Sequence, residues 1–416
     1  MAQLVPSTQA DRSADSSSSA EQPPWNRRRR IVAWMSVAVS FFACLILLEV
    51  ASYAYLRVVE GYDGHNLLPN QFDDYKHLQP TPNYRNTKGV VHNAQGFRRN
   101  SDVAMQKPLG TYRIFLMGGS TAYGLGSLSR LDRNKYEVLP NDGTIDHYLE
   151  RFLAAQLAPM PVEVINAAIM SHYSHHHLIY LNQTILKYQP DMVIFLDGYN
   201  DYFPYKEGFD QFRDYPYRSW SHLFLDAPTW KGLAAYMGWW LYMKSHFVHV
   251  VVKQVRPYWQ NWTDSAQGRE HIDVAEALRN LDVNADRNFV KMVERNSLVL
   301  RHEGIVPVVA LQPEIVYQQR KQLTPFEQTI LNEVATSWPV NFVEFKNQAR
   351  SLVTSKLQQA SEGNGAYFAD LTDIFLGVTD DAYSDHCHLT TSGNRTLAED
   401  LGQRLLPVIR SAAAHG

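Results

Sequence analysis

The stretch RIFLMGGSTAYG, from Arg113 to Gly124, runs from an apolar segment into two glycines, a serine and a threonine. An apolar run that ends in glycines is typical of a buried strand followed by a tight turn. Such a turn exposes a side chain at the end of the strand. The exposed group would serve one of two chemistries, phosphate binding by a glycine-rich loop or attack by a serine nucleophile.

The loop does not meet the requirements of nucleotide binding. A Walker-type loop needs a lysine to meet the phosphates, and no lysine follows Gly118, Gly119, Ser120 and Thr121. The later GLGSLS at 124–129 lacks the third glycine of a dinucleotide-binding fingerprint. Ser120 is therefore better interpreted as a nucleophile.

Short β-branched segments alternate with helical segments from residue 112 onward. The predicted strands are residues 112–117, 162–167, 191–197, 306–311 and a weaker fifth at 366–371. Strands separated by helices predict a parallel sheet covered on both faces, which is a three-layer α/β/α sandwich. In such a sheet the functional residues lie at the carboxyl edge of the strands.

A base and its orienting group occur near the C-terminus, in SDHCHLTTSGN. Asp385 and His388 are three residues apart, a spacing that puts both side chains on one side of a turn. The Asp385 carboxylate can then hold the Nδ1–H of the imidazole while Nε2 faces Ser120. Asn200, in DGYND after the third predicted strand, is placed to donate its amide N–H to an oxyanion.

Together these segments resemble the SGNH hydrolases, also called GDSL-type esterases and lipases. Four blocks occur in the family's order: MGGST, INAAIMSHYS, GYND and DHCH. The resemblance covers roughly residues 110–410 and implies a flavodoxin-like sandwich that hydrolyses or transfers acyl groups through an acyl-serine. It assigns catalysis to Ser120, Asp385 and His388, the oxyanion hole to Ser171 and Asn200, and supporting positions to Gly119, Gly198 and Asp201.

The chain departs from the family's pattern at two positions. The first block reads Gly-Gly-Ser-Thr instead of Gly-Asp-Ser-Leu, which leaves the serine in place. In the second block, Ser171 aligns with the usual oxyanion glycine, which donates its backbone N–H. Every residue except proline has that N–H, so the assignment depends on whether serine adopts the backbone geometry of glycine.

The N-terminal part predicts a membrane anchor. Residues 1–30 are rich in Ser, Ala and Asp, which predicts a disordered tail, and they end in four arginines. Residues 31–55 begin with the uncharged IVAWMSVAVSFFACLILL, long enough for one transmembrane helix. A cleaved signal peptide is the alternative, but its apolar region would be shorter and would end at a small-residue site. The positive-inside rule places the tail in the cytoplasm and everything after Tyr55 outside, in the periplasm of a Gram-negative cell.

Residues 56–110 are a Pro-, Asn- and Gly-rich connector, and 111–416 form the predicted hydrolase domain. Within this domain, 202–262 is an aromatic-rich insertion whose run GLAAYMGWWLYMKSHFVHVVV is long enough for a second span. A single crossing there would put Ser120 and His388 on opposite sides of the membrane. A lid or an interfacial helix is therefore favoured.

Two further groups are given no catalytic role. His172, His175, His176 and His177 are interpreted as a solvated helix start, because consecutive histidines on a helix point in different directions and no partner has metal-ligand spacing. Cys387, one of two cysteines, is interpreted as a packed neighbour of the base. No metal or other cofactor is expected.

The sequence predicts a membrane-anchored serine esterase that acts outside the cytoplasm on O-acyl esters, such as O-acetyl groups of an acylated glycan or lipid. A net charge of −3 gives no electrostatic reason to bind nucleic acid. Two alternatives stay open, an O-acyltransferase acting on cell-envelope polysaccharide and a catalytically silent envelope-binding protein with the same fold. The pattern names no protein partner.

Overall fold

The chain is described by a computed structural model over residues 27–59, 61–62, 66–126, 138–201, 206–211, 214, 230–255, 270–317 and 321–415. Most of the predicted disordered tail and much of the predicted insertion lie outside these residues. The chain divides into two compact units, Met1–Ala51 and Ser52–Gly416. Each unit is described by itself below.

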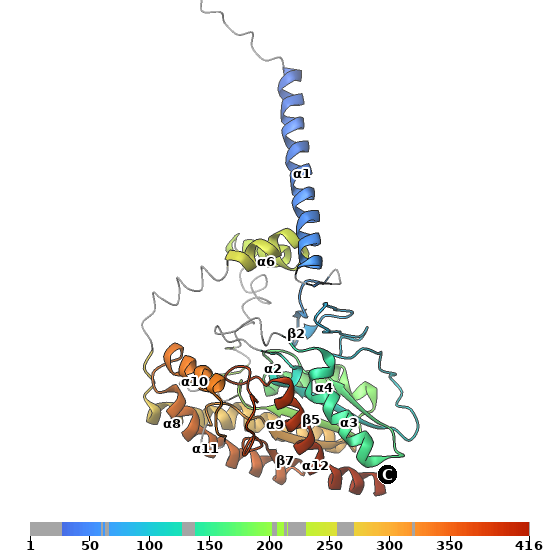
Figure 1. The fold of residues 1–416 in the computed structure, drawn as a ribbon, viewed down its shortest axis with the longest axis vertical. Helices are drawn as coiled ribbons and strands as arrows, with labels where there is room; N and C mark the ends of the chain where they lie inside the picture. The colour runs from blue at the N-terminus through green and yellow to red at the C-terminus, as the bar shows by residue number, and fades with distance from the viewer. Residues whose placement is uncertain are drawn as a thin grey trace, which may run out of the picture. The chain divides into compact units, whose positions relative to one another are not determined.

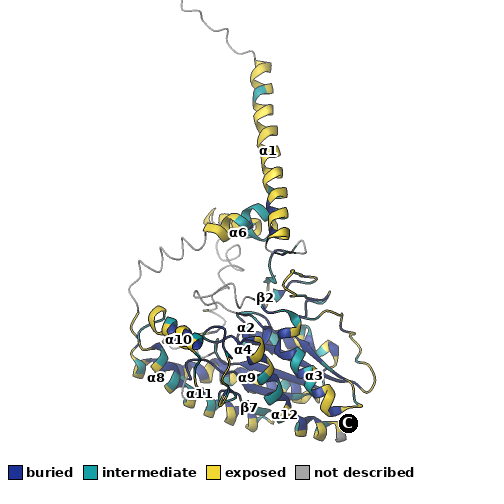
Figure 2. Cartoon of the chain, viewed as in Figure 1, coloured by how far each residue is buried: buried dark blue, intermediate teal, exposed yellow. Residues whose placement is uncertain are grey.

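Helix α1, Arg27–Val58, makes up the described part of the first unit and continues into the second (Figure 1). It begins at Arg27 and not at Ile31, so the four arginines at the end of the predicted tail form its first turn. Its apolar side chains are exposed, as the yellow ribbon in Figure 2 shows. Among the described residues, α1 is the one helix long and apolar enough to cross a membrane.

The second unit is built on a five-stranded parallel sheet with the strand order β4-β3-β5-β6-β7. The order reverses between β3 and β5, and open α/β sheets bind ligands at such a switch point. All five strands match predicted ones, the weak fifth included, which confirms the predicted parallel sheet. They are β3 Tyr112–Gly118, β4 Val162–Asn166, β5 Met192–Asp197, β6 Val306–Leu311 and β7 Tyr367–Asp370.

Helices cover both faces of the sheet, so the predicted three-layer sandwich is confirmed (Figure 1). Alternate residues of β3 pack against the two helix layers, because successive side chains of a strand point to opposite faces of the sheet. Ile114 and Leu116 pack with α3, whereas Phe115 and Met117 pack with α4. The covering helices are α3 Ile145–Leu157 and α12 Thr391–His415 on one face, and α4 Ser174–Gln183 and α9 Lys291–His302 on the other.

The other elements of the sandwich lie between or beside these layers. A capping box starts α10, where Thr324 and Glu327 accept each other's backbone N–H and Pro325 takes the first helical position. These remaining elements are α2 Ser120–Tyr123, η1 Asn141–Gly143, η2 Ile185–Tyr188, α8 Val274–Ala285, the short π-helix η3 Asp286–Val290, α10 Pro325–Ser337 and α11 Phe342–Gly363.

The connector contains an antiparallel hairpin that the sequence did not predict, formed by β1 Asn70–Asp73 and β2 His77–Pro80. Both strands are short and mostly polar, so they give no alternating apolar signal. The hairpin matters for the site because it packs against the segment that follows β4, as described below.

The apolar run of the insertion forms two helices and not one. Helix α6 covers Trp230–Lys244, and a second helix covers 246–255. The break lies at Ser245, whose Oγ accepts the N–H of Val248 at 3.2 Å and so caps the second helix. The run is therefore not one continuous span.

Candidate active site

Ser120 follows β3 at the switch point of the sheet and is the first residue of α2. Gly119 precedes it with a φ of −86°, so the left-handed region is not the reason for glycine here. The reason is space, because a Cβ at Gly119 would lie 2.7 Å from Nδ2 of Asn200. The turn thus brings the serine and the Asn200 amide to the same edge of the sheet.

A continuous chain of hydrogen bonds joins the three predicted catalytic residues. The Oγ–H of Ser120 donates to Nε2 of His388 at 2.7 Å, and Nδ1–H of His388 donates to Oδ2 of Asp385 at 2.7 Å. His388 and Asp385 are each 1% exposed, whereas Ser120 is partly exposed. The Ser120 hydroxyl is therefore the accessible end of this chain of hydrogen bonds, and the imidazole and the carboxylate are buried behind it.

The Asp385 carboxylate is stabilised as a charge. Burial opposes ionisation, but the neighbouring His388 and His386 and the hydrogen bonds that it accepts outweigh burial and hold the pKa of Asp385 below its usual range. Its Oδ1 accepts the backbone N–H of Cys387 at 3.0 Å and of His388 at 2.8 Å. Asp385 is thus an ionised partner that fixes the orientation of the imidazole.

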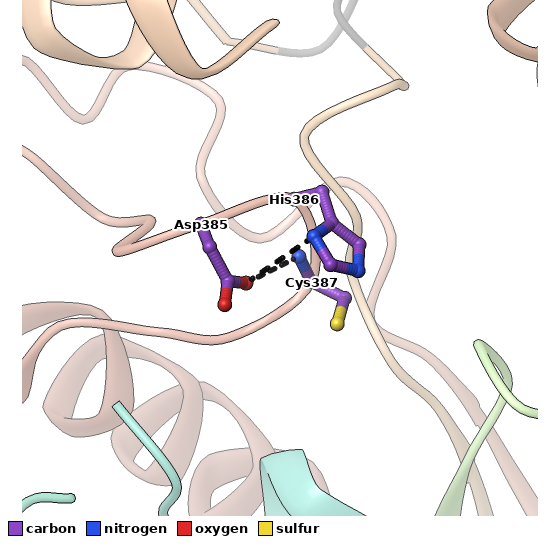
Figure 3. Close-up of side chains that lie close together, drawn as sticks. All are labelled: Asp385, His386 and Cys387. Carbon is purple, nitrogen blue, oxygen red and sulfur yellow. Dashed lines mark hydrogen bonds and ion pairs between the residues drawn. The ribbon is translucent and has the colours of Figure 1, made fainter. Parts of the chain in front are cut away.

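The ligand-type atoms of Asp385, His386 and Cys387 all lie within 4.8 Å of one another. Figure 3 shows the three side chains side by side on the loop. The carboxylate oxygens are already used by the hydrogen bonds to the loop and to His388. Burial raises the pKa of the Cys387 thiol well above its usual value, with Asp385 and Glu314 adding to the effect. Because the Asp385 carboxylate already accepts these three hydrogen bonds, the cluster fits a loop that orients His388 better than a metal site.

Glu327 holds the loop that carries Asp385 and His388, and no motif in the sequence marks it as part of the site. Its Oε1 accepts the N–H of Ala382 at 2.9 Å and of Tyr383 at 3.1 Å. Its Oε2 is paired with Nζ of Lys321 at 2.7 Å. Glu327 is fully buried, so it links the start of α10 to the catalytic loop through a charged pair.

The two predicted oxyanion donors lie on neighbouring segments. Ser171 has a φ of +66°, which is the left-handed geometry that glycine adopts easily and that the alignment with a glycine required. Nδ2 of Asn200 donates to the backbone oxygen of His172 at 2.9 Å, which ties its amide to the Ser171 segment. The second N–H of that amide is the one available to a substrate oxygen.

Asp201 and Gly198 support this edge in different ways. Asp201 is buried, and its Oδ1 accepts the N–H and the Oγ–H of Ser174, at 3.1 and 2.8 Å, at the start of α4. Burial and the nearby Asp197 raise its pKa to about 7, against the hydrogen bonds from Ser174. Gly198 has a φ of +149°, and a Cβ there would lie 3.0 Å from Gln312. Both residues fix the turn that presents Asn200.

The prediction of a solvated histidine cluster is wrong. His172, His176 and His177 are at most 1% exposed. The hairpin covers them, since Nε2 of His172 bonds the backbone oxygen of Leu78 at 3.0 Å and the ring of His176 lies 5.5 Å from that of His77. The sequence pattern could not show this, because the hairpin has no apolar alternation of its own.

The surroundings of these histidines shift their pKa values in different directions. Burial lowers the pKa of His172 and His176 well below the usual value, and neighbouring histidines add to the effect. Burial also acts on His177, but Asp197, whose Oδ1 lies 3.0 Å from Nε2, outweighs it and raises the pKa of His177. The oxyanion segment therefore lies on a packed, mostly neutral histidine layer.

The connector holds the helix of the candidate nucleophile. The guanidinium of Arg98 donates to the backbone oxygens of Tyr123 and Leu139 and lies 4.5 Å from the Tyr123 ring centroid. His92 bridges the backbone oxygen of Thr81, at 2.9 Å from Nδ1, and the Tyr123 hydroxyl, at 2.8 Å from Nε2. Because Tyr123 ends α2, these contacts fix the turn that carries Ser120.

No family model and no curated protein sequence matches the chain. Among solved structures, the acetyl xylan esterase AlAXEase matches at 12% identity and a TM-score of 0.36, over 71% of this chain and 100% of that chain. A lipase/acylhydrolase from Enterococcus faecalis matches at 14% identity and a TM-score of 0.32, over 71% of this chain and 95% of that chain. The psychrotrophic esterase EstA from Pseudoalteromonas sp. matches at 13% identity and a TM-score of 0.34, over 72% of this chain and 98% of that chain. These overlays are too loose to support an argument about the site.

The chain's own geometry defines its class. The strand order, the serine after β3, the Gly-x-Asn-Asp block after β5 and the Asp-x-x-His block before α12 give the fold of the SGNH hydrolases. Residues from these blocks meet at the switch point of the sheet, where the hydroxyl, imidazole and carboxylate form one chain of hydrogen bonds. The order of the three groups is the one that a serine nucleophile, its base and an orienting carboxylate require.

Proposed function

We propose that the protein is a membrane-anchored serine esterase that hydrolyses O-acyl esters outside the cytoplasm. The observation that carries the proposal is the chain of hydrogen bonds from Ser120 through His388 to Asp385, with two 2.7 Å contacts. A serine hydroxyl is a weak nucleophile unless an oriented base takes its proton, and this arrangement supplies that base.

The reaction follows from the positions of the groups. Oγ of Ser120 attacks the ester carbonyl carbon while Nε2 of His388 accepts its proton. The carbonyl oxygen becomes an oxyanion, stabilised by the backbone N–H of Ser171 and the amide of Asn200. Collapse of the tetrahedral intermediate releases the alcohol, which takes the proton from His388 and leaves an acyl-serine. Water, deprotonated by the same imidazole, then frees the acid and restores Ser120.

Two observations support the anchored topology: the helix α1 and the direct hydrogen bond between Ser120 and His388. The helix carries Arg27 to Arg30 at its N-terminal end, which the positive-inside rule assigns to the cytoplasm. The nucleophile and base bond directly although the insertion lies between them, so the chain between them crosses a membrane either not at all or an even number of times. We infer that the whole catalytic domain lies on the outer side.

The direct test is labelling with a fluorophosphonate, which reacts with activated serines. The wild-type protein should be modified on Ser120 and should hydrolyse short-chain aryl esters and acetylated polysaccharide. Ser120→Ala should abolish both while the protein stays folded. Labelling at another residue, or turnover that survives this substitution, would contradict the proposal. Transfer of the acyl group to an added glycan in place of water would identify an acyltransferase.

A further inference from the structure

One side of helix α6 is apolar and exposed. Trp230 and Met237 have 85% and 48% of their surface accessible. Successive exposed apolar residues are three, three, one, three and one positions apart, which places them on one side of a helix. Figure 2 shows α6 as largely exposed, in contrast to the helices of the sandwich. The exposed apolar residues are Trp230, Leu233, Tyr236, Met237, Trp240 and Leu241, called the outer side of α6 below.

The opposite side of α6 packs on the domain. The Trp239 ring lies 4.9 Å from that of Phe72 in β1, and Tyr242 stacks on His249 of the 246–255 helix at 4.7 Å. The helix is therefore held in one orientation, and its outer side is a fixed surface and not one face of a free segment.

The helix that supports α6 also contacts the end of α1. The ring of His246 lies 5.1 Å from that of Tyr53, and the ring of His249 lies 6.0 Å from that of Tyr62 just beyond α1. Tyr53 also accepts a hydrogen bond from Arg57 at 3.0 Å. Tyrosine and arginine at the end of a spanning helix mark the level of the lipid headgroups. The outer side of α6 is connected through these contacts to that level.

The charges of α6 suit the same surroundings. Its charged residues are Lys231 and Lys244, one near each end. Lysines at the ends of an interfacial helix reach the headgroups and are attracted to anionic lipids. Tryptophan, present twice on the outer side, prefers the boundary between headgroup and acyl chain.

We propose that α6 lies in the headgroup layer of the bilayer that α1 spans, with its outer side buried in lipid. The inference rests on the anchored topology of the proposed function and adds a second membrane contact to it. Through Phe72, α6 abuts the hairpin whose Leu78 backbone binds His172 next to the oxyanion segment. The catalytic centre would then work close to the lipid surface.

The test uses the full chain in nanodiscs of phosphatidylethanolamine and phosphatidylglycerol. Nitroxides are placed at single cysteines in a Cys44→Ser background, because the remaining Cys387 is buried. The probe is Met237→Cys, and its matched control is Gly238→Cys, the adjacent exposed position with open space around it, about 100° around the helix. Ile46→Cys reports on α1 itself.

Collisions with oxygen, which partitions into lipid, and with a water-soluble nickel chelate are compared at each nitroxide. The label at Met237 should collide mainly with oxygen and the label at Gly238 mainly with the chelate. Chelate-dominated collisions at Met237, with Ile46 still in lipid, would overturn the interfacial helix and leave the anchor intact. That result would leave the outer side to a protein partner. Chelate-dominated collisions at Ile46 would overturn the anchor and the inference together.

Discussion

The Nε2 atom of His388 lies 2.7 Å from Oγ of Ser120, although the two residues are 268 positions apart in the chain. The parallel sheet accounts for this contact, since the serine follows β3 and the histidine lies just before α12, and both segments end at the same edge. Thr121 adds a second link across this gap, with its hydroxyl donating to the backbone oxygen of Cys387 at 3.2 Å.

Replacing the base should harm turnover more than replacing its orienting group. His388→Ala removes the proton acceptor and should lower kcat by about 10³-fold or more, whereas Asp385→Ala leaves a misaligned base and should lose less. Initial rates on a short aryl ester measure both. Equal losses would contradict the separate roles, provided that circular dichroism shows both variants folded.

The positive φ of Ser171 predicts a graded series of substitutions. Ser171→Gly should keep full activity and Ser171→Ala most of it, because only the backbone N–H is required. Ser171→Val should lose about 10-fold, since a β-branched residue in the left-handed region costs roughly 1–2 kcal/mol. The kcat values on one ester decide the matter. A severe loss in Ser171→Ala would show that the hydroxyl takes part.

The Asn200 side chain should contribute directly to the transition state. Asn200→Ala deletes a donor and should lower kcat by about 10²-fold or more with little change in KM. Asn200→Asp should be worse still, because it places a negative charge beside the oxyanion. Steady-state kinetics on both variants separate these effects. Near wild-type kcat in Asn200→Ala would mean that the oxyanion is held elsewhere.

The buried His92 should make stability depend on pH. Burial lowers its pKa to about 4, partly opposed by the hydrogen bond to Thr81, while Arg98 adds to the lowering. Between about pH 6.5 and pH 4 the unfolded chain binds a proton that the folded chain resists, so the free energy of unfolding falls on acidification, by on the order of 3 kcal/mol.

Denaturant unfolding in detergent at pH 7 and pH 4 measures this contribution. His92→Gln, which keeps a donor and an acceptor, should lose less stability on acidification than the wild type, while the exposed His302→Gln should match the wild type. Identical losses in His92→Gln and wild type would assign the acid sensitivity to other groups, such as His172 and His176.

Membrane topology makes a prediction for the C-terminus. A reporter fused after Gly416 should be active only if it functions outside the cytoplasm, because α1 carries its arginines at the N-terminal end. Alkaline phosphatase and a cytoplasmic fluorescent protein form a suitable pair of fusions. Fluorescence without phosphatase activity would reverse the proposed orientation.

The sheet and the candidate triad were predictable because both depend on short local patterns. Each strand is an apolar run, and Ser120 and Asn200 each follow a strand directly, so their meeting at one edge follows from strand direction alone. The pair Asp385 and His388 lies within one turn and needs no long-range information. The fold therefore brings together residues that were already recognisable separately.

The residues that hold the site were not predictable, because their partners are distant and their own surroundings are unremarkable in sequence. Glu327 binds backbone groups 55 and 56 positions away, and Arg98 reaches a carbonyl 25 positions away. The burial of His176 depends on a hairpin without an apolar pattern. Contacts of this kind appear only once the layers are assembled.

The hairpin and the residues around Arg98 belong to the connector in sequence. In the fold they contact the segments that carry the candidate site, through His172 and Tyr123. With α1 as the proposed anchor, a protease that releases the catalytic domain would have to cut between Val58, at the end of α1, and Asn70, at the start of β1. A cut there would keep the catalytic domain intact and leave the proposed lipid contact of α6 as its remaining attachment to the membrane. A cut between Thr81 and His92 would separate the two residues whose hydrogen bond helps to fix α2. The released domain would then lose its activity.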